Sequence, residues 1–278
     1  MDLYSKAVEM AKKYKQNNKV EAILLAGSVS RGWQDQHSDI ELHILWKEPP
    51  SEIERKNPID KSGGNILDFY PYEDEEWSET FLVEGVKFEI SNFLTETVAR
   101  FVRQVVDHHQ TDYDLQCIAA SVFYGKCLHG ESVINQLKSK VMIYPQKLSE
   151  NMILEHLELS GRWNNRLALV DRKDWLMLYE IVCDTQRKVL GALFGINKMY
   201  VHHPAFKWLD HVVQCMEVKP RDLYNRLSGV LLDGDPKKGI LELEEIIQEV
   251  FELAEEKFPS LNIDELKKRA DFVRPEHC

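Results

Sequence analysis

Hydrophobic and polar residues follow two different periods along the chain. Residues 3–17 repeat apolar positions at helical spacing, which predicts an amphipathic helix. Residues 20–26 and 40–46 are short apolar runs and predict buried strands. Residues 66–72 and 81–93 predict further strands, the second because apolar and polar positions alternate in it. The first third of the chain therefore predicts a sheet.

The pattern changes further along. Residues 49–64 are polar, contain proline, serine and a glycine pair, and predict a loop with room for one helical turn. Everything after about Tyr113 has helical spacing. Strands followed by helices predict an α+β protein. We expect an N-terminal domain over residues 1–112, with a small mixed sheet and helices, and an all-α helical-bundle domain over residues 113–278.

Composition places the chain among globular proteins. It has 278 residues, of which 44% are hydrophobic and 29% charged, enough for a sizeable core. No apolar stretch approaches the roughly 18 residues of a membrane span, so no membrane partner is expected. The N-terminus predicts a mixed-charge helix without the apolar core of a secretory signal. These features predict a cytoplasmic protein.

Net charge and cysteine usage argue against further classes of protein. The formal net charge is −11, and nucleic-acid binding usually needs a basic face, so no nucleic-acid partner is expected. The cysteines are odd in number and lack a CxxC spacing: Cys117, Cys127, Cys183, Cys215 and Cys278. This spacing argues against a disulfide framework or a zinc cluster and predicts reduced thiols.

Two acids stand one residue apart in the second apolar run. Residues i and i+2 of a strand share a face, so Asp39 and Glu41 point together while Ile40 and Leu42 point into the core. Two neighbouring carboxylates repel unless something neutralises them. A hard cation such as Mg²⁺, which prefers oxygen ligands, can do so. The pair therefore predicts a metal site.

A turn of small residues precedes the acids. Glycine at position 27 allows a close backbone approach to a phosphate, and the Ser28 hydroxyl with nearby amides supplies donors to the same anion. Arg31 and Ser38 are candidates for additional phosphate contacts. Phosphate donors beside metal-holding acids predict a site for ATP or another nucleoside triphosphate.

These residues carry a family resemblance. A Gly-Ser turn followed about ten residues later by acid, hydrophobic residue and acid resembles the nucleotidyltransferase superfamily related to DNA polymerase β. That superfamily has a third acid on a later strand, and "GVKFEISNF" offers Glu89 in the right phase. The resemblance implies that Asp39, Glu41 and Glu89 bind two Mg²⁺ ions, and that residues 1–112 form the catalytic domain.

A closer resemblance is to the kanamycin type of aminoglycoside nucleotidyltransferase. It rests on "SDIE", "VKFEISNF" and "LELSGRWNNR". It implies that Glu158 is the general base for the acceptor hydroxyl. It also implies that Arg162, where the family usually has lysine, contacts phosphate. We expect Glu158 and Arg162 on one face of a helix, four residues apart. The resemblance further implies a homodimer whose active sites lie between subunits.

The resulting hypothesis is Mg²⁺-dependent transfer of a nucleoside monophosphate, AMP from ATP, to a hydroxyl of a small, aminoglycoside-like acceptor. An acidic cleft would favour a polycationic acceptor. The alternatives are a protein or RNA acceptor, and a catalytically silent nucleotide-binding protein. For single residues, Glu89, Glu158 and Arg162 are also compatible with ordinary surface positions, and Ser38 with a turn cap.

Overall fold

The computed structural model describes residues 2–159 and 161–275, which form two compact units. The first contains the residues up to His108 together with Asp112–Ile143, and the second contains His109–Thr111 together with the residues from Tyr144 onward. The boundary thus differs from the one predicted between residues 112 and 113, because two helices and a strand beyond it pack with the sheet.

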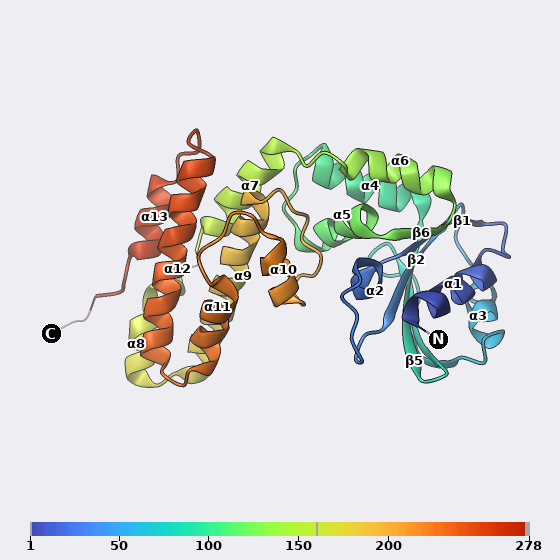
Figure 1. The fold of residues 1–278 in the computed structure, drawn as a ribbon, viewed down its shortest axis with the longest axis horizontal. Helices are drawn as coiled ribbons and strands as arrows, with labels where there is room; N and C mark the ends of the chain where they lie inside the picture. Colours follow the sequence, from blue (N-terminus) through green and yellow to red (C-terminus); the bar gives the residue numbers. More distant parts are fainter. Residues whose placement is uncertain (1, 160, 276–278) are drawn as a thin grey trace. The chain divides into compact units, whose positions relative to one another are not determined.

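The first unit is a six-stranded mixed sheet with helices on both faces (Figure 1). The strand order is β3-β4-β5-β2-β1-β6, in which β2 and β5 are parallel and every other neighbouring pair is antiparallel. Its elements are α1 (Leu3–Tyr14), β1 (Val20–Leu25), α2 (Gly27–Arg31), β2 (Ile40–Trp46), α3 (Glu52–Asp60), β3 (Asn65–Phe69), β4 (Trp77–Val83), β5 (Val86–Leu94), α4 (Thr95–Val106), α5 (Tyr113–Tyr124), β6 (Lys126–His129) and α6 (Glu131–Val141).

The strands β1 and β2 confirm the two apolar runs, but the region predicted as one strand over residues 81–93 is a hairpin. Glu84 and Gly85 both have positive φ, 50° and 77°, and Val83 pairs with Val86 across them. Two central residues with positive φ form the tight turn whose twist suits a two-residue hairpin. The chain therefore reverses between β4 and β5.

Helix α3, nine residues long, is longer than the single helical turn predicted within residues 49–64, and strand β6 was not predicted. Helix α3 begins with a capping box, in which the Ser51 hydroxyl accepts from the Glu54 amide and the Glu54 carboxylate accepts from the Ser51 amide. Strand β6, only four residues long, lies in the region predicted to be wholly helical. It pairs with β1 at the edge of the sheet.

A buried polar cluster links the sheet to the helices on one face. The Arg55 guanidinium of α3 donates to the Glu79 carboxylate of β4 at 3.0 Å, and both side chains are almost fully buried. Tyr14 of α1 and Asn92 of β5 also donate to Glu79, at 3.1 and 2.9 Å. Buried charge is tolerated because it is paired and hydrogen-bonded. This cluster fixes α1 and α3 on the sheet.

The second unit is built from helices packed around the long helices α9 and α12 (Figure 1). Its elements are α7 (Gln146–Leu157), the 3₁₀ helix η1 (Trp163–Asn165), α8 (Arg166–Arg172), α9 (Trp175–Ile196), α10 (Leu209–Cys215), α11 (Leu223–Leu232), α12 (Pro236–Lys257) and α13 (Asp264–Asp271). Helix α7 packs closely on α9 because Gly195 faces Met152, whose Cβ would lie 2.6 Å from a Cβ at that position.

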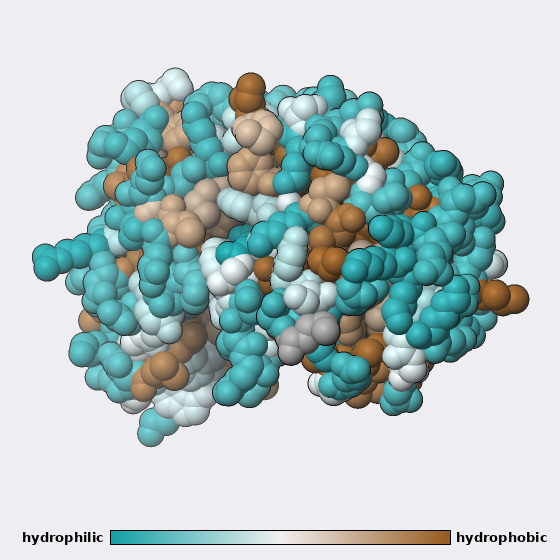
Figure 2. Space-filling model, turned by 45° about the vertical axis from the view of Figure 1, so that its right-hand side comes forward, coloured by the Kyte–Doolittle hydropathy of each residue, from teal (hydrophilic) through white to brown (hydrophobic). Residues whose placement is uncertain are grey.

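The face drawn in Figure 2 is mainly hydrophilic, with hydrophobic side chains scattered over it. Among the helices of the described residues, we find none with both the length and the apolar character needed to cross a bilayer. Together, the mixed sheet and the helical second unit confirm the α+β fold class.

Candidate active site

Three acids meet on the two central strands of the sheet in the first unit, near the start of β2. Strands β2 and β5 run parallel in a register that sets Glu41 opposite Glu89, and Asp39 immediately precedes β2 on the same face. One carboxylate oxygen from each of these residues lies within 4.8 Å of the others, and all three side chains are partly buried. The structure therefore brings together the three acids that the sequence singled out.

Lys87 lies against this acidic trio. It stands two residues before Glu89 and so shares its face of β5. Its ammonium is 3.5 Å from Asp39 Oδ2 and also contacts Glu89 Oε1. The hydrogen bond to Glu89 is the main cause that raises the pKa of Lys87 above its ordinary value. The sequence analysis missed this residue, although its spacing from Glu89 already placed it on that face.

The Gly27 turn packs directly on one of the acids. Gly27 has a φ of +61°, and a Cβ placed there would lie 2.3 Å from Glu41 Oε1. The amide of Ala26 donates to the Glu41 carbonyl at 3.0 Å, and the Ser30 hydroxyl donates to the Gly27 carbonyl at 2.8 Å. Glycine is therefore required twice, for its backbone conformation and for the room it leaves to Glu41.

Arg31 and Ser38, predicted to contact phosphate, have defined partners in the first unit. The Arg31 guanidinium lies over the Tyr124 ring, 3.9 Å from its centroid, and over Trp33 at 4.8 Å. The Ser38 hydroxyl accepts from the Asp35 amide at 2.9 Å and donates to the Asp35 carboxylate at 3.1 Å. Ser38 thus closes the turn that leads into Asp39, as a turn cap would.

His43 lies one row further along the sheet from the acids. It shares the face of Glu41 on β2, is paired in register with Ser91, and packs edge-on against Phe93 at 5.6 Å between ring centroids. Burial lowers the pKa of His43 to about 4. The imidazole is therefore neutral at physiological pH and adds no positive charge beside the acids.

Glu158 and Arg162 belong to the second unit, and the expectation that they share a helix face is wrong. Helix α7 ends at Leu157, and Glu158 has non-helical backbone angles of φ −76° and ψ 87°. Glu158 accepts from Arg269 at 2.7 Å, whereas Arg162 donates to Glu180 at 3.0 Å. Both side chains are exposed, and Ser160 between them lies outside the described residues.

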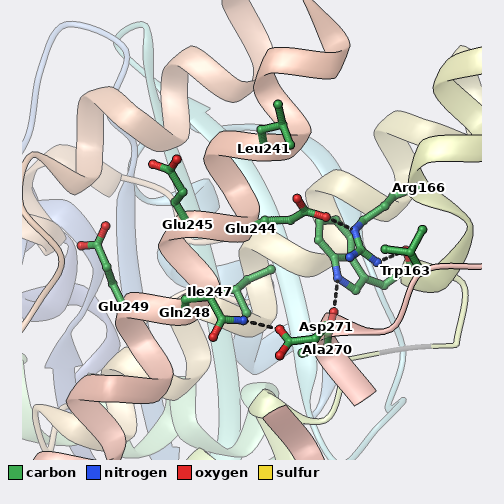
Figure 3. Close-up of a pocket in the computed structure, with 11 residues that line it drawn as sticks. Trp163, Arg166, Leu241, Glu244, Glu245, Ile247, Gln248, Glu249, Ala270 and Asp271 are labelled. Carbon is green, nitrogen blue, oxygen red and sulfur yellow. Dashed lines mark hydrogen bonds and ion pairs between the residues drawn. The ribbon is translucent and has the colours of Figure 1, made fainter. Parts of the chain in front are cut away.

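A hollow in the second unit has a volume of about 690 Å³ (Figure 3). Several of the polar side chains that line it contact other residues of the lining. Arg166 contacts Glu244, the Trp163 indole donates to the Ala270 carbonyl at 3.1 Å, and Gln248 contacts Asp271. These contacts tie α13 to η1 and to α12, and α8 to α12.

The chemistry of the acidic trio suits a hard divalent cation. All three donors are carboxylate oxygens, the ligand type that Mg²⁺ prefers. The missing side chain at Gly27 leaves the space that the Glu41 carboxylate occupies beside the other two acids. Asp39, Glu41 and Glu89 therefore fit a magnesium site in both donor type and spacing.

Comparison with known proteins adds limited information. A family model described as a domain of unknown function (DUF4037) matches residues 112–209. That stretch includes Glu158 and Arg162 but none of the three clustered acids. Among solved structures, the chain is similar to a nucleotidyltransferase-like protein from Exiguobacterium sibiricum, with 12% identity and a TM-score of 0.42. The alignment covers 96% of this chain and 88% of that one. No curated protein matches.

Proposed function

We propose that this protein is a metal-dependent nucleotidyltransferase, which moves a nucleoside monophosphate from a triphosphate to an acceptor hydroxyl. One observation carries the proposal. Three carboxylates from two adjacent parallel strands converge within 4.8 Å beside the tight Gly27 turn. This arrangement supports joint binding of a divalent cation and a triphosphate, which nucleotidyl transfer requires.

In this proposal, Asp39, Glu41 and Glu89 would hold Mg²⁺. A bound divalent cation supplies charge stabilisation to phosphoryl oxygens during in-line displacement. In the reaction, the acceptor oxygen forms a bond to the α-phosphorus while the bond to pyrophosphate breaks. The amides and hydroxyl at Gly27 and Ser28 would orient the triphosphate, and they are held in place by the contacts of the turn to Glu41.

Arg31 adds a fixed cation at the end of the same short helix. Guanidinium groups stack on aromatic rings and bind phosphate through parallel N–H groups. The Arg31 guanidinium lies over the Tyr124 and Trp33 rings, and these two contacts restrict its movement. We infer that this restriction prepares Arg31 to contact the phosphates. Ser38 would act on Asp39 indirectly, through the turn that it closes.

We also propose the identity of the nucleotide donor, the class of the acceptor and the general base. ATP is the proposed donor, and a small polycationic, aminoglycoside-like molecule the proposed acceptor, in keeping with the net charge of −11. Glu158 would take the proton from the acceptor hydroxyl. Arg162 would bind phosphate, which requires it to leave Glu180. A homodimer remains part of the proposal, because the resembling enzymes build each site from two subunits.

The test is a pyrophosphate-release screen with the four common nucleoside triphosphates against a panel of aminoglycosides and other polyols. We expect release with at least one donor and acceptor pair, dependent on Mg²⁺ and abolished in Asp39→Asn. Asp68→Asn is the matched control, because it removes the same charge from an exposed position on β3 of the same sheet.

Two other results would redirect the proposal. Labelled nucleotide appearing on protein or RNA from a cell lysate would keep the chemistry and change the acceptor. Calorimetry that shows Asp39-dependent ATP binding without pyrophosphate release for any acceptor would make the protein a nucleotide-binding protein. Absence of both ATP and metal binding in the wild type would reject the nucleotidyltransferase proposal.

A further inference from the structure

Among the described lysines, only Lys87 has its ammonium between two of the three clustered acids. Its Nζ lies 3.5 Å from Asp39 Oδ2 and contacts Glu89 Oε1. The two acids come from different strands, so Lys87 bridges β2 and β5 at the point where the metal ligands converge. The bridge runs across the site and does not merely continue along one strand.

The charges of the three acids and Lys87 bear on how many metal ions the site can bind. The three carboxylates carry three negative charges when ionised, and the lysine ammonium supplies one positive charge. A single divalent cation then makes the four groups neutral. Two divalent cations would leave the same groups with an excess of two positive charges before a triphosphate binds. Before a triphosphate binds, the charge balance of these four groups therefore favours one ion.

The position of the Lys87 ammonium also bears on the number of metal ions. Two-metal sites hold their ions roughly 3.5–4 Å apart, bridged by shared carboxylates. The Lys87 ammonium lies at hydrogen-bonding range from Asp39 and Glu89, which is where an ion shared by these two acids would lie. A second ion would have to displace the ammonium and break its contact with Glu89. The lysine and the second ion thus compete for the same oxygens.

We propose that Lys87 takes the place of the second metal ion, so that the site binds one divalent cation and keeps a fixed ammonium beside Asp39 and Glu89. This inference rests on the proposed function to the extent that the acids bind metal. It also changes the expectation of two magnesium ions.

The inference restricts what Lys87 can do in the reaction. A protonated amine cannot accept the proton of the acceptor hydroxyl, so Lys87 is a positioning residue for the carboxylates and a source of positive charge. The proton must then go to another base. Glu89, already engaged by Lys87, is a poor candidate for that task, which is consistent with the role proposed for Glu158.

Metal stoichiometry tests this directly. Mn²⁺ binding to the full chain would be followed by the electron paramagnetic resonance of free Mn²⁺, with and without a non-hydrolysable ATP analogue. We expect one bound ion per wild-type chain. Lys87→Met should either bind two ions or bind the first roughly tenfold tighter or more, because a positive charge has left the site. Lys87→Arg should resemble the wild type.

Lys12→Met is the matched control, because it removes a lysine charge from the same unit at a residue paired only with Glu9 among the ion pairs described. Circular dichroism and melting curves would confirm that each variant is folded. Asp39→Asn identifies which Mn²⁺ ions belong to the acidic trio.

Two Asp39-dependent ions in the wild type, or identical binding in Lys87→Met and the wild type, would overturn the role of Lys87 while leaving the metal site intact. If neither protein bound Mn²⁺ at all, with or without nucleotide, the metal site of the proposed function would fail and this inference with it. The two failures are therefore distinguishable.

Discussion

The carboxylate of Glu41 occupies the space that a side chain on Gly27 would need. A Cβ at Gly27 would lie 2.3 Å from Glu41 Oε1 and 2.9 Å from Oε2. The turn that is proposed to bind phosphates and the acid that is proposed to bind metal are therefore in direct contact. A change in one must displace the other, which couples the two halves of the candidate site.

The first prediction concerns Gly27→Ala. The new Cβ should push the Glu41 carboxylate away and weaken Mn²⁺ binding roughly tenfold or more, comparable to losing a supporting contact of a metal ligand. The positive φ adds a destabilisation of roughly 1–2 kcal/mol for a non-glycine residue. Mn²⁺ titration and urea unfolding measure the two effects separately.

Gly63→Ala is a matched control, because Gly63 has a similar φ of +63° and no heavy atom within 4 Å of a Cβ. It should show the loss of stability without the loss of metal affinity. Equal metal affinity in the two variants would mean that Glu41 moves aside without consequence, and would separate the turn from the metal site.

Much of this site could be predicted from sequence, because it depends on strand alternation. Asp39 and Glu41 are two residues apart, and the alternation of Val86, Phe88 and Ile90 fixes the phase of Glu89. Their convergence then needs only that the two strands be neighbours. That these residues bind metal and nucleotide remains a prediction.

Other elements of the fold depend on contacts between distant residues, which the local sequence pattern does not show. The four residues of β6 are too few to show a period, and they form a strand only because β1 has a free edge for them. Glu158 was placed on a helix because helical spacing runs up to it, whereas α7 ends one residue earlier. The start of α3 was readable, since Ser51 and Glu54 have the spacing of a capping box.

The second prediction concerns the buried pair of Arg55 and Glu79. Arg55→Met removes the guanidinium that pairs with Glu79 and leaves a buried carboxylate with fewer donors. Breaking a buried pair in this way destabilises by about 3–5 kcal/mol. Urea unfolding followed by fluorescence measures the change.

Lys56→Met, which breaks an exposed i,i+4 pair with Glu52 on the same helix, should change stability by less than about 0.5 kcal/mol. Pairing Arg55→Met with Glu79→Leu should recover part of the loss, because no buried charge then remains. If Arg55→Met alone were as mild as Lys56→Met, the pair would not contribute to stability.

The third prediction is a dependence of stability on pH. Burial lowers the pKa of His156 to about 4 from 6.5, so the folded state favours the neutral imidazole. The unfolded chain binds a proton near pH 6.5 and the folded chain does not. The contribution of His156 to stability is therefore full above pH 6.5 and falls between pH 6.5 and 4, by about 3 kcal/mol. His43, whose pKa burial also lowers to about 4, adds a separate loss over the same range.

Thermal unfolding between pH 7.5 and pH 4.5 tests this linkage. His156→Leu, which cannot titrate, should lose less stability across this range than the wild type. His108→Leu, at an exposed histidine, should keep the full loss. If His156→Leu and the wild type lost the same stability, another group would have to account for the acid sensitivity.

The fourth prediction separates metal binding from proton transfer. Glu158 belongs to the second unit, whereas the acidic trio belongs to the first, and the Glu158 carboxylate is paired with Arg269. Once an acceptor is known, Glu158→Gln should lower kcat by roughly 10²–10⁴, the range of a general base, and leave Mn²⁺ binding unchanged. Glu150→Gln, an acid on α7 paired with Lys147, is the control and should keep kcat.

Alanine variants at Asp39 and Glu158 test the subunit arrangement. If Glu158 of one chain serves the active site of its partner, mixing Asp39→Ala and Glu158→Ala chains should restore activity. One of the two sites in a mixed dimer then combines an intact acidic trio with an intact base. A verified mixed dimer that stayed inactive would place both groups in one chain. Retained kcat in Glu158→Gln would instead assign the proton to another acceptor, and since Lys87 is protonated and bound to Glu89, that acceptor would have to be sought outside this pair.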